Sequence, residues 1–108
     1  MSQHILTVCV EGAEISILAG WDRVCRTFFL DVSKLEPDGE PDEEICLYSS
    51  SNVNHGVSID DMKRELEKLG VNVHESLFEQ LEQDCRNNIG NRYAVHAADG
   101  SFVDRIPQ

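Results

Sequence analysis

Carboxylates gathered in one short stretch are the side chains of this 108-residue chain whose types and spacing most suggest chemistry. Six of the nine residues 36–44 are acidic and none is basic. The six acids are Glu36, Asp38, Glu40, Asp42, Glu43 and Glu44. Pro37, Gly39 and Pro41 prevent a helix or a central strand here, so residues 34–44 are predicted to form a solvated acidic loop. General acid–base catalysis needs a carboxyl group held in a desolvated cleft, so we expect no catalytic residue in this loop.

A metal site is not expected in the acidic stretch either. The calcium loop of an EF-hand has acids at positions 1, 3 and 5, glycine at position 6 and glutamate at position 12. In this chain Gly39 directly follows Asp38, and the two flanking prolines fix dihedral angles that do not suit such a loop. The sequence therefore predicts no metal ligands and no cofactor.

The histidines and cysteines show no catalytic or metal-binding spacing. His4, His55, His74 and His96 form neither an H-x-x-x-H nor an H-E-x-x-H motif, and we expect His55, His74 and His96 to be ordinary surface residues. The cysteines at positions 9, 25, 46 and 85 form no C-x-x-C motif and lie in apolar patterns, where we expect reduced thiols that pack as small apolar side chains. No phosphate-binding glycine motif and no nucleophile elbow occurs. The protein is therefore predicted not to be an enzyme.

The only tryptophan lies in the sequence Trp21-Asp22-Arg23, which is predicted to be a turn over residues 19–23. One interpretation places the indole at the edge of the core and pairs Asp22 with Arg23 or with a turn amide. The other makes Trp21 and Arg23 an exposed anchor for a partner protein, because these residue types dominate binding hot spots.

The remaining pattern predicts the elements that position these groups. Alternating apolar residues indicate strands at 5–10, 14–18, 24–32, 45–49, 93–96 and 102–106. Ser58 and Asp61 form a capping-box pattern ahead of a helix over 59–69, and a second helix is expected over 75–86. The order ββββααββ predicts an α+β fold with an antiparallel or mixed sheet. We expect both helices on one sheet face, covering Val24, Phe28, Leu30 and Val32.

The composition limits the classes of partner that we expect this protein to bind. The chain carries a net charge of −11 with 41% hydrophobic residues, which indicates a folded acidic protein. Such a surface repels phosphate backbones and anionic lipid, so direct binding to nucleic acid or to a membrane is not expected. No Lys or Arg precedes the short apolar run near the N-terminus, so we expect no secretion signal and a single cytoplasmic domain over residues 1–108.

Four short stretches carry a resemblance to known proteins: residues 19–23 (Ala-Gly-Trp-Asp-Arg), 28–30 (Phe-Phe-Leu), 47–49 (Leu-Tyr-Ser) and 88–91 (Asn-Ile-Gly-Asn). Together they resemble a group of small uncharacterised proteobacterial proteins found in accessory or plasmid-borne regions. In that group Pro-Leu-Gln-Gly follows the Trp-Asp-Arg turn, where this chain has Val-Cys-Arg-Thr at 24–27. The resemblance implies a bacterial, cytoplasmic, mobile-element setting and brings no activity.

Three hypotheses for function remain. In the first, the protein is an inhibitor or regulator that presents its acidic loop to a basic protein surface, as anti-CRISPR or anti-restriction proteins do, in partial mimicry of nucleic acid. In the second, it is an interaction, adaptor or immunity-type domain that uses Trp21 and a free sheet edge, through which it also self-associates, and the acidic loop only confers solubility. The third is an enzyme with an unrecognised site.

Overall fold

The computed structural model describes residues 1–35, 44–50 and 57–105. Its elements follow the chain as β1 (Ser2–Val10), β2 (Ala13–Asp22), β3 (Thr27–Leu35), β4 (Glu44–Ser49), α1 (Ile59–Lys68), α2 (Glu75–Arg86), β5 (Arg92–His96) and β6 (Phe102–Arg105). The predicted order ββββααββ and the α+β class are confirmed.

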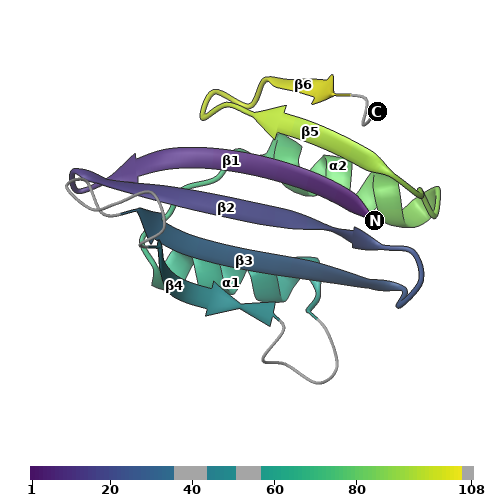
Figure 1. Ribbon diagram of the computed structural model, residues 1–108, viewed down its shortest axis with the longest axis horizontal. Helices are drawn as coiled ribbons and strands as arrows, with labels where there is room; N and C mark the ends of the chain where they lie inside the picture. The colour runs from purple at the N-terminus through teal and green to yellow at the C-terminus, as the bar shows by residue number, and fades with distance from the viewer. Residues whose placement is uncertain (36–43, 51–56, 106–108) are drawn as a thin grey trace.

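The strands form one mixed sheet in the order β4-β3-β2-β1-β5-β6 (Figure 1). The first four strands make an antiparallel meander, and β5 and β6 form an antiparallel hairpin. Strand β1 joins the two halves by pairing in parallel with β5, with Ile5 opposite Val95. A parallel pair needs a long crossover connection, and here both helices lie within it.

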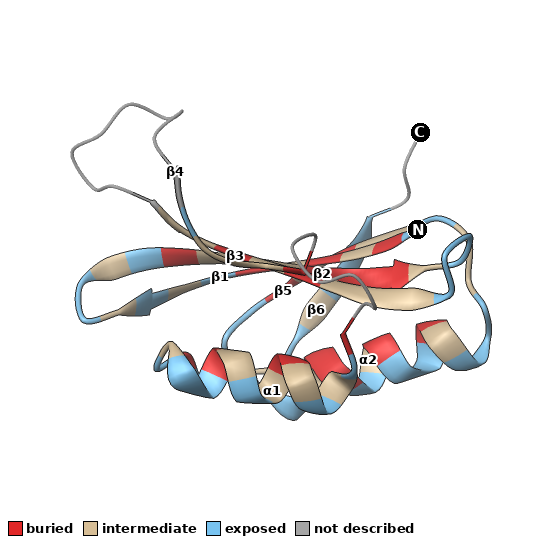
Figure 2. Ribbon diagram, turned by 90° about the horizontal axis from the view of Figure 1, so that it is seen from below, coloured by how far each residue is buried: buried red, intermediate tan, exposed pale blue. Residues whose placement is uncertain are grey.

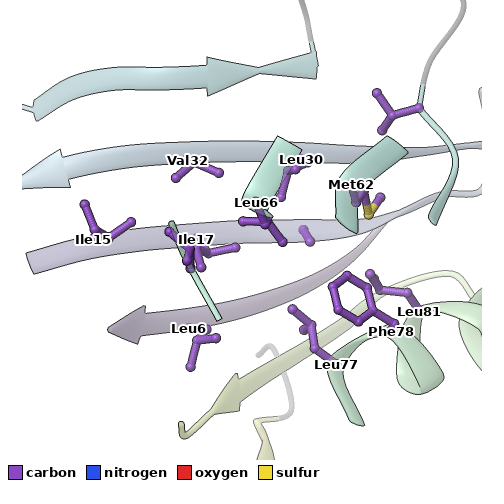
Figure 3. Packing of buried hydrophobic residues seen from close by; sticks show 13 residues of the cluster. Leu6, Ile15, Ile17, Leu30, Val32, Met62, Leu66, Leu77, Phe78 and Leu81 are labelled. Atoms are coloured by element: carbon purple, nitrogen blue, oxygen red, sulfur yellow. The ribbon is translucent and has the colours of Figure 1, made fainter. Parts of the chain in front are cut away.

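Both helices lie on one face of the sheet, as predicted (Figure 2). The apolar cluster between the two layers is drawn in Figure 3. Its buried members are Leu6, Ile15, Ile17, Ala19, Leu30, Val32, Val57, Met62, Leu66, Val71, Leu77, Phe78 and Leu81. Burying one large apolar side chain contributes about 1.5–3 kcal/mol, so this layer is the main source of stability.

The ends of α1 follow the capping rules read from the sequence. The hydroxyl of Ser58 accepts from the Asp61 amide at 3.1 Å, and the Asp61 carboxylate accepts from the Ser58 amide at 3.1 Å. This is the predicted capping box. Gly70 follows the last turn with φ of +73°, a left-handed conformation that glycine adopts without steric cost.

The boundary between β2 and β3 differs from the prediction. Strand β2 continues to Asp22, and the turn lies at residues 23–26, so the predicted turn at 19–23 is wrong. The Asp22 carboxylate accepts from the amides of Val24 and Cys25 at 3.0 and 3.2 Å, which fixes the turn. Val24 is consequently 92% exposed, so it does not join the covered row formed by Leu30 and Val32.

Gly20 lies inside β2 because no side chain fits there. A Cβ at this position would lie 1.9 Å from the Ser2 carbonyl oxygen and 2.5 Å from the Phe29 ring. The glycine therefore permits a close approach of backbones in the sheet, a frequent reason for glycine within a strand.

The predicted loop 34–44 is shorter at both ends, since Lys34 and Leu35 belong to β3 and Glu44 begins β4.

The sheet face opposite the helices carries a row of apolar side chains. Ile5 pairs in register with Leu18 on one side and with Val95 on the other, and Val95 pairs with Val103. Because residues directly opposite each other share a face, this row crosses four adjacent strands. In the described part of the chain no helix lies over it (Figure 2).

Candidate functional site

Most of the predicted acidic site falls outside the described residues. These members are Glu36, Asp38, Glu40, Asp42 and Glu43. Glu44 is placed by its backbone at the start of β4, opposite Leu35, and Leu35 lies opposite Glu14. The acidic segment is therefore attached to the end of the sheet at which β2 begins.

The β1–β2 turn and the last turn of α1 also lie at this end of the molecule (Figure 1). Glu11 lies in the β1–β2 turn and Glu14 near the start of β2. Glu67 lies in the last turn of α1, which runs toward the same end. We call the end defined by Glu11, Glu14, Glu44 and Glu67 the acidic end.

A groove of about 470 Å³ lies at the connection between α1 and α2, and Glu67 of the acidic end is one of the residues that line it. Buried Leu66, Val71 and Phe78 line its apolar part. Glu67 and Glu75 supply carboxylates to its rim. Lys63 also lines the groove: its ammonium lies 3.0 Å from Glu75 Oε1 and 5.1 Å from the centre of the Phe78 ring. The groove thus combines an apolar floor with a charged margin, in which Glu75 is paired with Lys63 and Glu67 adds a further carboxylate.

The acids of the two helices contribute less free charge than their number suggests. Asp61 pairs with Arg64 at 3.4 Å and Glu65 with Lys68 at 3.3 Å, both on the exposed side of α1. Asp84 is buried and faces the sheet. Exposed ion pairs contribute only about 0–1 kcal/mol and are screened by salt, but they do reduce the charge that a partner meets.

The structure places Trp21 in the interior, so its interpretation as an exposed anchor is wrong. Its side chain is 7% exposed, its Nε1 donates to Asn88 Oδ1 at 3.3 Å, and its ring meets Phe28 edge-on at 5.1 Å. The competing interpretation is confirmed, because Asp22 pairs with turn amides. The pKa of Asp22 is lowered, and the hydrogen bond from the Cys25 amide is the main cause.

Arg23 is exposed in the β2–β3 turn, and its guanidinium lies beside Gly90. Arg26 is exposed in the same turn, and Arg86 is exposed in the last turn of α2. Both elements lie at the end of the molecule opposite the acidic end (Figure 1). Exposed arginines therefore lie at the end opposite the acidic end, whereas exposed Lys68 lies beside Glu67 in the last turn of α1, so both signs of charge occur at the acidic end.

A second groove, of about 450 Å³, opens near the β2–β3 turn. Trp21, Phe28 and Val57 form its apolar wall, and Arg26 and Asp61 line its polar part. Trp21 thus reaches the surface only as part of this wall.

A chain of charged hydrogen bonds crosses the interface between α2 and strands β1, β5 and β6. His4 Nε2 lies 2.6 Å from Asp84 Oδ2, and His4 Nδ1 lies 2.8 Å from His96 Nε2. Arg92 donates from Nη1 to Asp84 and from Nε to Asp104, both at 2.7 Å. His4, Asp84 and His96 are 0%, 1% and 6% exposed. We call these five residues the buried polar network, whose outer end, Asp104, is exposed.

The protonation states in the network follow from its contacts. Burial opposes the ionisation of Asp84, but hydrogen bonds from His4, Arg92 and Ser2 outweigh it and lower the pKa of Asp84. Burial, reinforced by the nearby positive charges of His4 and Arg92, lowers the pKa of His96 from 6.5 to about 4. Asp84 is therefore an ionised acceptor and His96 a neutral imidazole at pH 7.

The expectation of an ordinary surface residue is wrong for His96, and His4 is buried as well. The sequence held a signal for them: in β1, His4 alternates with Leu6 on the inward face, and in β5, His96 alternates with Ala94. Asp84 likewise follows Leu81 by three residues on the inward stripe of α2. A titratable residue at an inward position predicts a buried partner, because an unpaired buried charge is costly.

The cysteines also differ from the expectation that they pack in apolar surroundings. Cys9, Cys25 and Cys46 are exposed free thiols, and Cys85 is half-buried at the second groove. Among the described residues no group of three or more His, Cys, Asp and Glu side chains is placed to hold a metal ion.

No described helix has the length and apolar character needed to cross a membrane. Comparison with protein-family models, with curated proteins and with solved structures finds no match to this chain. The resemblance to accessory-genome proteins therefore stays a prediction, and the protein is classified by its fold alone, as an α+β protein with a six-stranded mixed sheet.

Proposed function

We propose that this protein is a small, non-enzymatic inhibitor or regulator that binds a basic surface of another protein through its acidic end. Suitable partners are nucleic-acid-binding proteins or complexes in the bacterial cytoplasm, whose basic surfaces the carboxylates engage in place of a phosphate backbone. The mode of action is then like that of anti-CRISPR or anti-restriction proteins.

The observation that carries this proposal is the gathering of exposed carboxylates around the attachment points of segment 36–44. Glu11, Glu14 and Glu67 lie at this end, while exposed Arg23 and Arg86 lie at the other. A local concentration of carboxylates attracts an approaching basic partner and raises its association rate, an effect that depends on ionic strength. The groove beside Glu67 and Glu75 offers the same partner an apolar contact.

Partner capture from bacterial lysate with quantitative mass spectrometry tests the proposal. Replacing Asp42, Glu43 and Glu44 by serine should weaken capture of the partner more than tenfold and leave the fold intact. A matched control removes three other exposed carboxylates, by Asp60→Asn, Glu79→Gln and Glu82→Gln. Both triple variants change the net charge from −11 to −8, so only the position of the lost charge differs.

Ionic strength provides the second measurement. Exposed charges are screened over about 8 Å at 0.15 M salt, so the captured partner should be lost between low and physiological salt. Equal capture by the two triple variants, or capture indifferent to salt, would contradict binding at the acidic end.

The uncovered sheet face favours a second candidate function, an interaction domain that self-associates or binds an apolar partner. The row of Leu18, Ile5, Val95 and Val103 is the supporting observation, and Val103 is 63% exposed at edge strand β6. Val103→Asp should then abolish association, measured by sedimentation, with little loss of stability. Association of the wild type that is insensitive to salt would favour this candidate; a wild type that stays monomeric would exclude self-association.

A further inference from the structure

The sheet face opposite the helices has an apolar centre flanked by two unlike charges. The apolar row crosses β6, β5, β1 and β2, where it ends at Leu18, and Asp31 of β3 lies directly opposite Leu18. The neighbours of Asp31 in β3, Leu30 and Val32, belong to the buried cluster under the helices, so the Asp31 side chain lies on the uncovered face. Its carboxylate accepts a hydrogen bond from Ser49 Oγ at 2.7 Å.

Arg105 supplies the opposite charge at the other flank of this face. It follows exposed Val103 by two residues in edge strand β6, and residues two apart in a strand share a face. Asp104, which lies between them, binds Arg92 of the buried polar network and therefore lies on the helix side. Arg105 is exposed, and among the described residues neither Arg105 nor Asp31 has an ion-pair partner in its own chain.

The face is large enough for a protein interface. Neighbouring strands lie about 4.8 Å apart and each residue adds about 3.3 Å, so six strands of four to ten residues cover roughly 700 Å². A standard interface buries about 800 Å² on each partner, which is close to this area. The ring of Phe29 in β3 lies across Gly20 of β2 and extends the apolar part of the face toward β3.

We propose that the uncovered sheet face binds a second copy of the chain, with a two-fold axis that runs along β1. Sheets that pack face to face lie about 10 Å apart and keep their strands within about 30° of each other. Strands β6 and β3 are each two positions away from β1, on opposite sides of it. The axis therefore places β6 of each copy over β3 of the other copy.

A second copy is the partner that fits because the face is complementary to itself. In a two-fold interface the same patch is used by both copies, so the apolar centres meet each other and each Arg105 meets the Asp31 of the other copy. Along the strands Arg105 and Asp31 differ in level by two residues, about 7 Å, which an arginine side chain spans. Two ion pairs therefore close the two flanks of the apolar centre.

The acidic end is left available by this arrangement. Strand β4 is three positions from β1, whereas the other half of the sheet ends with β6 at two positions. Strand β4, with Glu44 at its start, therefore extends beyond the second copy. The inference rests on the second candidate function, self-association, and is independent of whether the acidic end binds a basic partner.

Charge exchange across the interface tests the arrangement, with association measured by sedimentation equilibrium. Arg105→Glu and Asp31→Arg each place like charges opposite one another at both flanks, so each should raise the dimer dissociation constant at least tenfold. The double variant exchanges the two charges, keeps the net charge at −11 and should restore association. Arg64→Glu is the matched control, because it makes the same change as Arg105→Glu on the exposed side of α1, and it should associate like the wild type.

Cross-linking of native thiols provides a measurement that leaves Asp31 and Arg105 unchanged. Cys9 is an exposed thiol of β1 on the same face as Ile5, and therefore lies on the proposed axis. A bismaleimide that spans the sheet spacing of about 10 Å should join two copies of a variant that keeps Cys9 as its only cysteine. In the control variant, which keeps only exposed Cys46 of β4, the two thiols would lie about 29 Å or more apart, six strand spacings, and no covalent dimer should form.

The possible failures are distinguishable. A wild type that is monomeric in solution would overturn this inference and the second candidate function together. A dimer whose association is not restored by the charge exchange, or that is cross-linked through Cys46 and not through Cys9, would overturn this arrangement and leave self-association standing.

Discussion

Helix α1 is held on the sheet by apolar contacts, whereas α2 combines such contacts with a buried ionic network. From α1, Met62 and Leu66 enter the apolar cluster, and the charged residues of this helix face outward. From α2, Leu77 and Leu81 do the same, but Asp84 enters the sheet side and meets His4 and Arg92.

This difference between apolar contacts and a buried ion pair determines what each helix needs to stay on the sheet. Apolar burial depends on the area removed from water and involves no titrating group. A buried ion pair is costly to form, because both charges leave water, and it depends strongly on both partners being present. The attachment of α2 therefore depends on Asp84 keeping its partners as well as on apolar burial, whereas that of α1 depends on apolar burial.

Removal of the Asp84 charge should lower the free energy of unfolding more than any other change proposed for the two helices. In Asp84→Asn, one N–H of the new amide must face a donor of His4 or of Arg92, and the Arg92 guanidinium loses one of its two carboxylates. Removing one partner of a buried ion pair costs about 3–5 kcal/mol, so the free energy of unfolding in urea at pH 7 should fall by this amount. Glu82→Gln, an exposed change two residues away, should stay within about 0.5 kcal/mol of the wild type. Similar small effects of both changes would mean that the network adds little.

Met62→Ala tests the apolar packing that holds α1 on the sheet. Met62 is fully buried, and its truncation should cost about 2–5 kcal/mol through lost burial and the cavity left behind. Because no titratable group is removed, the loss should be the same at pH 5 and pH 8. A deficit that grows on acidification would show that the packing of α1 depends on a titrating group.

The smallest expected effect concerns the start of α1. Ser58→Ala removes the side-chain acceptor of the capping box and should lower the free energy of unfolding by about 1 kcal/mol. Ser58→Asp, which retains an acceptor, should restore most of the loss. No change in either variant would mean that α1 depends on packing alone.

Much of the fold could be predicted from local patterns. The bounds of α2 match the prediction because its apolar residues recur at helical spacing and its ends carry ordinary stop signals. The capping box at Ser58 was equally local. The β2–β3 boundary could not be placed, because Gly20 normally indicates a turn and the reason for it here is the Ser2 carbonyl oxygen on a neighbouring strand.

The buried polar network could not be predicted from spacing. His4 and Asp84 are 80 residues apart, and His4 and His96 are 92 apart. Their contact requires the parallel pairing of β1 with β5, which no local pattern specifies. Trp21 was ambiguous for a related reason, since its burial depends on Phe28 and Asn88.

The pairing of β1 with β5 also constrains how the polypeptide is made. Residues 2–6 lie in the middle of the sheet, beside residues 92–96 (Figure 1). During synthesis on the ribosome one edge of β1 stays unpaired until β5 has emerged. Such long-range closure is slow, so truncated nascent chains should stay exposed to chaperones and proteases. Only chains extended through β5 can form the parallel pair of β1 and β5.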